Sequence, residues 1–123
     1  MVKILIADDR QLMRSALKTM FAMRPKWGIC GEATDGHEVV TKVSELQPDL
    51  ILMDFKMPLA DGIQAATQIS ATSPSIPIVM YTLYRNDELD AAAKQAGVRS
   101  VVSKQDGLHN LLEAIDAELP HVK

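Results

Sequence analysis

The stretch Leu50-Ile51-Leu52-Met53-Asp54 consists of four apolar residues followed at once by an acid. A continuous apolar run of this length predicts a strand that is buried on both faces, as in a parallel sheet. A polar residue directly after such a strand lies at the edge of the sheet where ligands bind in open α/β structures. Both the fold and the search for a functional site therefore start from this segment.

Similar short apolar runs recur along the chain, at 4–7, 28–32, 76–80 and 100–103. Between them, apolar residues recur at helical spacing. The predicted helices cover the segment from Leu12 to a stop near Pro25, the segment from Val39 to Pro48, the segment around Ile63–Ile69, a helix from an Asp87 cap to a stop at Gly97, and the segment from Leu108 to Leu119. Five strands that alternate with five helices predict an α/β fold, a flavodoxin-like doubly wound five-stranded parallel sheet of order 2-1-3-4-5.

Length and composition narrow the function classes. The 123 residues, 47% hydrophobic and 24% charged, fit one globular domain spanning 1–123, either stand-alone or excised from a longer protein. A net charge of -3 argues against nucleic-acid binding by this domain. The single Cys30 cannot form an internal disulfide. No signal peptide opens the chain and no apolar run approaches the roughly 18 residues of a membrane span, so we expect a cytoplasmic protein with no membrane contact.

Polar residues follow four of the predicted strands. Asp8 and Asp9 follow the first, Asp54 the third, Thr82 the fourth and Lys104 the fifth. These ends share one sheet edge, where three carboxylates repel one another unless a cation is present. Mg²⁺ is a hard ion that prefers oxygen ligands and is often held by one or two carboxylates plus phosphate oxygens. The pattern therefore predicts a magnesium site in which one Asp acts as a nucleophile toward phosphorus and Lys104 and Thr82 contact the phosphoryl oxygens.

The same segments carry a resemblance to a known family. The whole chain, in order, resembles the bacterial two-component response-regulator receiver domain, of which the chemotaxis receivers are examples. The motifs are Leu5-Ile6-Ala7-Asp8-Asp9, Met53-Asp54-Phe55-Lys56-Met57-Pro58 with Asp61-Gly62, Met80-Tyr81-Thr82 and Val102-Ser103-Lys104. Gly31-Glu32-Ala33 with Asp35-Gly36, and a Lys104 that no Pro follows, resemble the LuxR-type transcription-regulator subgroup.

The resemblance implies a role for each residue of the site. Asp54 matches the phosphorylated residue, Asp9 the direct Mg²⁺ ligand, Asp8 the acid that reaches the metal through water, and the backbone carbonyl of Lys56 the third protein ligand. Thr82 and Lys104 match the phosphate-binding pair.

The resemblance also implies a biological setting. The phosphodonor would be a sensor histidine kinase or phosphotransfer protein, and the receiver would catalyse only its own phosphorylation and dephosphorylation rather than act as an enzyme on other molecules. Phosphorylation would change its conformation and control an output, expected to be transcription through a C-terminal DNA-binding domain outside this chain. A homodimer formed on phosphorylation is an open alternative.

Some positions depart from the family pattern. Val101 stands where an aromatic switch residue is usual, Gln105 where Pro often follows the Lys, and Leu83 where a small residue is usual. How the switch works without an aromatic at Val101 is left open. Lys56, Leu83 and Tyr84 are expected to surround the opening of the phosphoryl pocket.

Three rival functions share parts of this pattern. A flavodoxin would need a phosphate-binding loop after the first strand, where Asp8-Asp9-Arg10 would repel the cofactor. A phosphatase of the haloacid-dehalogenase type would need an acid at the position of Lys56. A degenerate receiver that acts as an unphosphorylated interaction module is the alternative that stays open.

Overall fold

The computed structural model describes residues 1–119 as five strands, five α-helices and one short 3₁₀ helix. The strands are β1 (Val2–Ala7), β2 (Trp27–Ala33), β3 (Leu50–Met53), β4 (Ile78–Thr82) and β5 (Ser100–Ser103). The helices are α1 (Gln11–Phe21), α2 (Gly36–Leu46), α3 (Gly62–Thr72), α4 (Asp87–Gln95), the 3₁₀ helix η1 (Lys104–Asp106) and α5 (Leu108–Glu118). None of the helices within residues 1–119 is long and apolar enough to span a membrane.

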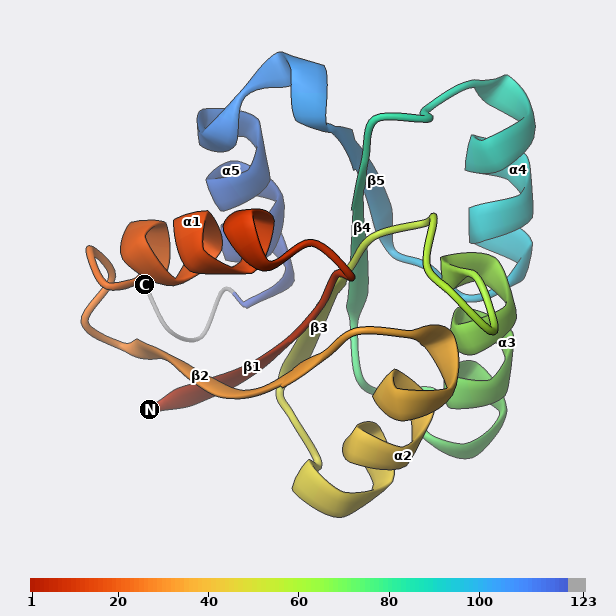
Figure 1. Cartoon of the computed structure of the whole chain (residues 1–123), viewed down its shortest axis with the longest axis horizontal. Helices are drawn as coiled ribbons and strands as arrows, with labels where there is room; N and C mark the ends of the chain where they lie inside the picture. The colour runs from red at the N-terminus through yellow and green to blue at the C-terminus, as the bar shows by residue number, and fades with distance from the viewer. Residues whose placement is uncertain (120–123) are drawn as a thin grey trace.

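The strands form one parallel sheet in the order β2-β1-β3-β4-β5, which confirms the predicted topology. Helices α1 and α5 cover one face, and α2, α3 and α4 cover the other (Figure 1). Because all five strands run the same way, their carboxyl ends lie along a single edge of the sheet.

Each face of the sheet has its own hydrophobic core. Alternate residues of β1 enter the two cores: Leu5 packs toward α2 and α3, whereas Ile4 and Ile6 pack toward α1 and α5. All four residues of β3 are buried, as its continuous apolar sequence predicts. The two cores hold the sheet in place and leave its carboxyl edge for polar residues.

Short polar side chains begin three of the helices. Asp35 accepts a hydrogen bond from the Glu38 N–H at the start of α2. Asp61 and Gln64 form a reciprocal capping box at α3. At α4 the cap is Asn86, whose side chain accepts from the Leu89 N–H, and not Asp87 as predicted from the sequence. Asn and Asp cap helices about equally well, so two adjacent candidates cannot be ranked by residue type.

The bounds of β4 differ from the sequence-based expectation. Strand β4 covers Ile78–Thr82 instead of 76–80. Pro77 has no N–H to donate to the sheet, and the Ile76 N–H is used by Ser73 in the preceding turn. At its other end, β4 extends to Thr82, which pairs with Ser103 of β5.

Candidate functional site

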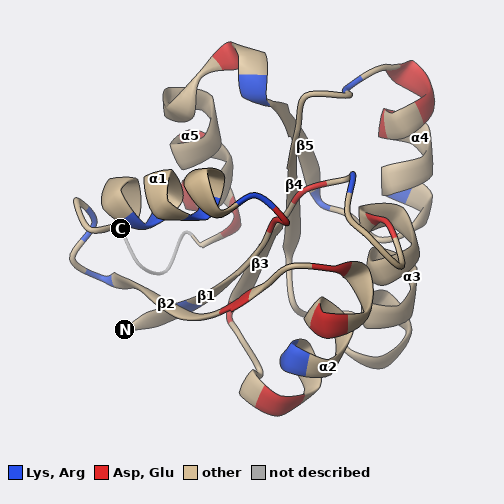
Figure 2. Ribbon diagram, in the orientation of Figure 1, with Lys and Arg blue, Asp and Glu red and all other residues tan. Residues whose placement is uncertain are grey.

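The carboxyl edge of the sheet brings the predicted acids together. Ala7 of β1 pairs with Met53 of β3, so the residues that follow them, Asp8 and Asp54, leave adjacent strands side by side. Asp8 and Asp54 are both buried, which is unusual for carboxylates. Figure 2 shows acidic residues at the ends of β1 and β3 and basic residues in the segments that follow β1, β3 and β5.

The backbone around Asp54 fixes the direction of its side chain. The Asp54 N–H donates to the Ala7 carbonyl at 2.9 Å, and the following Phe55 N–H donates to Asp54 Oδ1 at 2.8 Å. Gly62 permits this arrangement because a Cβ there would lie 2.5 Å from the Asp54 carbonyl oxygen. The α3 N-terminus can thus pack directly under the loop that carries Asp54.

Lys104 reaches the same point from the end of β5. Its Nζ lies 3.2 Å from Asp8 Oδ2 and 3.2 Å from Asp54 Oδ2, and its side chain is only 4% exposed. Burial raises the pKa of the Asp54 carboxyl above its ordinary value, Lys104 opposes this shift, and the nearby Asp8 adds to it. We call Asp8, Asp54 and Lys104 the inner wall of the site.

Asp9 completes the cluster of acids. One oxygen each from Asp8, Asp9 and Asp54 lie within 4.8 Å of one another, and Asp9 is exposed whereas the other two are buried. Three carboxylates then face one buried cation, so the inner part of the site carries excess negative charge. Such oxygen-rich, acidic surroundings suit a hard divalent cation.

A polar bridge fastens the loop that carries Asp8 and Asp9. Arg14 of α1 donates to the Asp8 carbonyl at 2.9 Å and to Glu32 Oε1 at 2.9 Å. Glu32, at the end of β2, also binds Lys18 at 2.6 Å. The hydrogen bond from Lys18, with that from Arg14, lowers the pKa of Glu32 and keeps its carboxylate charged. Sequence reasoning missed Arg14, because nothing in its position marks a contact with a residue eighteen places away.

A cavity of about 180 Å³ opens above the inner wall. That volume exceeds the roughly 30 Å³ occupied by one water molecule in the liquid, so an ion with waters and a phosphoryl group has room. Asp9, Asp54 and Lys104 line its inside. The other four lining residues are exposed and surround its opening. We call them the rim: Arg10, Lys56, Leu83 and Tyr84.

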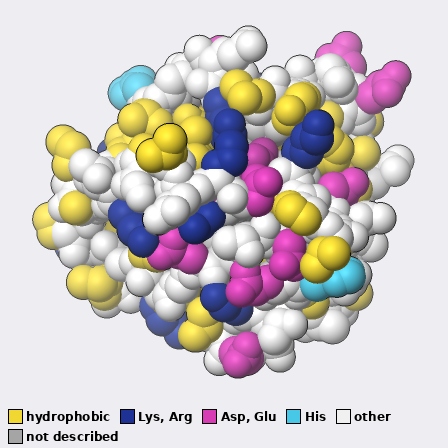
Figure 3. Space-filling model, viewed as in Figure 1, with side chains coloured by type: hydrophobic (Ala, Val, Ile, Leu, Met, Phe, Trp, Pro, Cys, Tyr) yellow, Lys and Arg dark blue, Asp and Glu magenta, His cyan; other side chains and the backbone are white. Residues whose placement is uncertain are grey.

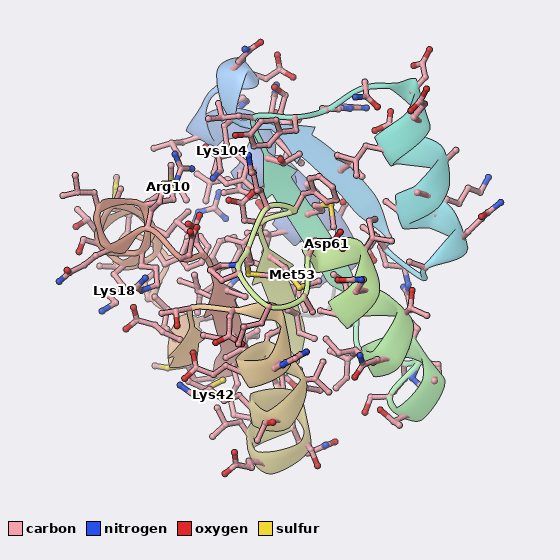
Figure 4. All side chains as sticks on the ribbon, turned by 45° about the vertical axis from the view of Figure 1, so that its right-hand side comes forward. Arg10, Lys18, Lys42, Met53, Asp61 and Lys104 are labelled. Carbon is pink, nitrogen blue, oxygen red and sulfur yellow. The ribbon has the colours of Figure 1, made fainter. Side chains whose placement is uncertain are left out.

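The rim includes the three residues expected there from the sequence. Lys56 Nζ lies over the Tyr84 ring, 5.2 Å from its centroid, so the β3–α3 and β4–α4 loops meet across one side of the opening. Arg10, on the α1 side, was not predicted to line the site; its place directly after the acid pair was the available signal. Figure 3 shows acidic side chains beside basic ones on this face, and Figure 4 shows Arg10 and Lys104 approaching from different elements.

Thr82 is close to the site but does not line the cavity. It is fully buried, and its hydroxyl oxygen accepts from the Tyr84 N–H at 3.1 Å. The hydroxyl can still donate its own proton. Tyr81, the preceding residue, is buried against the α1–α5 side and its ring lies 5.5 Å from Lys104 Nζ. The structure therefore joins Asp8, Asp9, Asp54 and Lys104 directly and places Thr82 beside them.

The sequence model described as "response regulator receiver domain" matches residues 4–116. This chain belongs to the response-regulator receiver family. The match covers β2 to β5, most of β1 and all residues of the site, so the family assignment and the geometry concern the same part of the molecule.

Relatives and solved structures agree with this assignment. The receiver is 34% identical to the response regulator GacA of Pseudomonas syringae pv. syringae over 94% of its own length and 54% of that protein. A LuxR-family two-component response regulator from Aurantimonas superposes with a TM-score of 0.92 at 26% identity, covering 98% of this chain and 86% of the other. The response regulator domain of Thermotoga maritima CheB gives 0.90 at 28%, covering 97% and 96%. The chain spans about half the length of the curated relatives it matches.

Proposed function

We propose that this receiver accepts a phosphoryl group on Asp54 in a Mg²⁺-dependent reaction. The observation that carries the proposal is the buried Asp54 carboxylate, 3.2 Å from Lys104 and grouped with Asp8 and Asp9 at the base of a cavity. A buried carboxylate that opens only into such a cavity is reached by a phosphodonor from one side.

The metal would be held by Asp9 and Asp54 directly, by Asp8 through a water molecule, and by the backbone carbonyl of Lys56. One oxygen from each of the three acids lies within 4.8 Å of the others, a grouping that suits the ligands of one hard cation. Bound Mg²⁺ would supply positive charge against the phosphoryl oxygens and the carboxylates.

The protein groups would divide the chemistry among them. One Asp54 oxygen attacks phosphorus, the bond from phosphorus to the donor's leaving group breaks, and its electron pair departs with that group. Lys104 stabilises the charge on the transferred phosphoryl group, and the Thr82 hydroxyl donates to it once the β4–α4 loop moves inward. That movement is the conformational switch, a shift between two populated states.

The partners follow from the family and from the length of the relatives. The donor would be a phosphohistidine on a sensor kinase or phosphotransfer protein in the cytoplasm, and the receiver would catalyse only its own labelling and hydrolysis. The output would be transcription through a DNA-binding domain outside this chain, with dimerisation on phosphorylation as one route.

Intact-mass measurement after incubation with a small phosphodonor and Mg²⁺ tests the proposal. The parent should gain one phosphoryl group and Asp54→Asn should gain none. Asp61→Asn is the matched control, because Asp61 lies at the N-terminus of the same loop's helix, outside the cavity. An unlabelled parent would favour the degenerate receiver, and labelling of Asp54→Asn at that position would refute the acceptor assignment.

A further inference from the structure

Three cations surround the cavity, and they differ in how fully their charge is engaged. Lys104 lies at the base between two carboxylates, and Lys56 lies over the Tyr84 ring. Arg10 forms a longer ion pair: its Nε is 3.7 Å from Asp8 Oδ1, and its side chain is 47% exposed. Within residues 1–119 no hydrogen bond engages the terminal nitrogens of the Arg10 guanidinium. Arg10 therefore keeps donors free for a molecule in the cavity.

The backbone of Arg10 limits where its side chain can go. Its N–H donates to Asp8 Oδ1 at 2.9 Å, and its extended conformation (φ −98°, ψ 117°) directly precedes α1. The loop is fixed further by the bond from Arg14 to the Asp8 carbonyl. A long side chain on a fixed base keeps the guanidinium at the opening of the cavity, on the side of α1 (Figure 4).

In-line transfer places the donor's leaving group on the side of phosphorus opposite Asp54. Because Asp54 forms the base of the cavity, that side faces the opening and the rim. The leaving group of an acyl phosphate is a carboxylate, which takes the electron pair of the broken P–O bond and needs no proton. The nitrogen of phosphoramidate is protonated as –NH3⁺ in neutral solution, so its leaving group is neutral ammonia when the P–N bond breaks and the electron pair stays on nitrogen. Only the first develops a charge that a planar guanidinium can bind through two parallel hydrogen bonds.

We propose that Arg10 determines donor specificity in this receiver by favouring phosphodonors whose leaving group is a carboxylate. The inference rests on the proposed function, since it assumes transfer to Asp54. It assigns Arg10 to the departing group and leaves the metal and the phosphoryl oxygens to the inner wall.

Initial labelling rates of the parent, Arg10→Gln and Arg10→Lys, followed by intact mass at fixed Mg²⁺ and ionic strength, test this inference. With acetyl phosphate, Arg10→Gln should be slowed about tenfold, roughly the effect of one charge-assisted hydrogen bond. Carbamoyl phosphate, which also leaves as a carboxylate, should behave alike. With phosphoramidate the rate should change less than about twofold. Arg10→Lys should recover part of the loss, because it restores the charge but not the paired donors.

Arg85→Gln is the control, an exposed arginine paired with Asp90 away from the cavity. Calorimetric Mg²⁺ affinity provides a readout that is independent of transfer, and it should stay within about twofold in Arg10→Gln. Equal slowing with all donors, no slowing with any, or a matching loss of Mg²⁺ affinity would each overturn the role of Arg10. A parent that none of the donors labels would instead overturn the Asp54 proposal, and the Arg10 inference with it.

Discussion

The inner wall and the rim of the cavity are a few ångströms apart and are built in opposite ways. The side chains of the inner wall are buried and follow directly after strands. Within it, Lys104 forms ion pairs with both Asp8 and Asp54. The rim residues are exposed and come from loops. Their contacts are longer: Lys56 Nζ lies 5.2 Å from the centre of the Tyr84 ring, and Arg10 Nε lies 3.7 Å from Asp8 Oδ1. Strand ends hold charges rigidly because the sheet fixes their backbone, whereas loops can exchange side chains at little cost.

This difference separates two kinds of property. In the proposed function, the inner wall carries out the chemistry that every donor needs, and a displaced atom there would be costly. The proposals assign donor choice and signal lifetime, which vary with the biological task, to the rim. Substitutions on the inner wall should therefore change whether transfer occurs, and substitutions on the rim should change how fast.

The largest effect is expected at Asp9, which lines the cavity beside the inner wall but is exposed. Asp9→Ala should weaken Mg²⁺ binding by at least about 100-fold, since even changes to groups that only support a ligand cost 10–100-fold. The fold should survive, because Asp9 is exposed and its removal relieves repulsion among the acids.

Calorimetry is the suitable measurement for Asp9→Ala. Trp27, the chain's single tryptophan, begins β2 and packs edge-on against Phe21. It lies at the other end of the strand from the site, roughly 20 Å away at about 3.3 Å per residue, and is a poor reporter. Asp61→Asn should bind Mg²⁺ like the parent. An unchanged affinity in Asp9→Ala would rule out direct ligation.

A smaller effect is expected at the rim. The phosphorylated receiver should persist for many minutes, because Lys56, Leu83 and Tyr84 restrict the in-line approach of water. Lys56→Asn combined with Leu83→Ala should speed loss of the label roughly tenfold, followed by mass after the donor is removed. Leu59→Ala, an exposed change outside the cavity, is the control. A double variant that decays at the parent's rate would contradict the shielding role.

The inner wall and three of the four rim residues could be predicted from the sequence, whereas Arg10 could not. The run 50–53 allows only a buried strand, and a buried parallel strand fixes where Asp54 must lie. The strand order then brings Asp8 and Lys104 to it. The direction of the Arg10 side chain depends on the loop around it, which no local pattern specifies.

Predictions that depended on tertiary contacts were also the less accurate ones. Thr82 lies beside the cavity and not in its lining, its oxygen accepts from the Tyr84 N–H, and its contact with a phosphoryl group stays a prediction. The start of β4 depends on a proline next to a turn, and the α4 cap on a choice between neighbouring Asn86 and Asp87. In each case residue type permitted two local solutions, and packing selected one.

The smallest expected effect is on the stability of the fold. The sign of the stability change in Asp54→Asn tests whether the ionised Asp54 destabilises the inner wall. The pKa of Asp54 is raised in the folded protein, chiefly by burial, so ionising it costs the folded state more than the unfolded one. Above the folded pKa this cost is fully present. It shrinks as the pH falls through the folded pKa and is gone below the ordinary carboxyl value of about 3.9.

Asp54→Asn removes that ionisation while keeping the side-chain shape, so at neutral pH without metal it should melt a few degrees above the parent. The advantage should narrow as the pH is lowered toward about 3, because the parent's carboxyl then becomes protonated. Adding Mg²⁺ should reverse the order, since an ion at about 100 times its dissociation constant stabilises the parent by roughly 2.7 kcal/mol.

Lys56→Gln on the rim should follow the parent's melting curve at every pH. A parent that melts above Asp54→Asn at neutral pH in the presence of a chelator would show that Lys104 compensates fully for the burial of Asp54, and that the inner wall is relaxed before the metal binds.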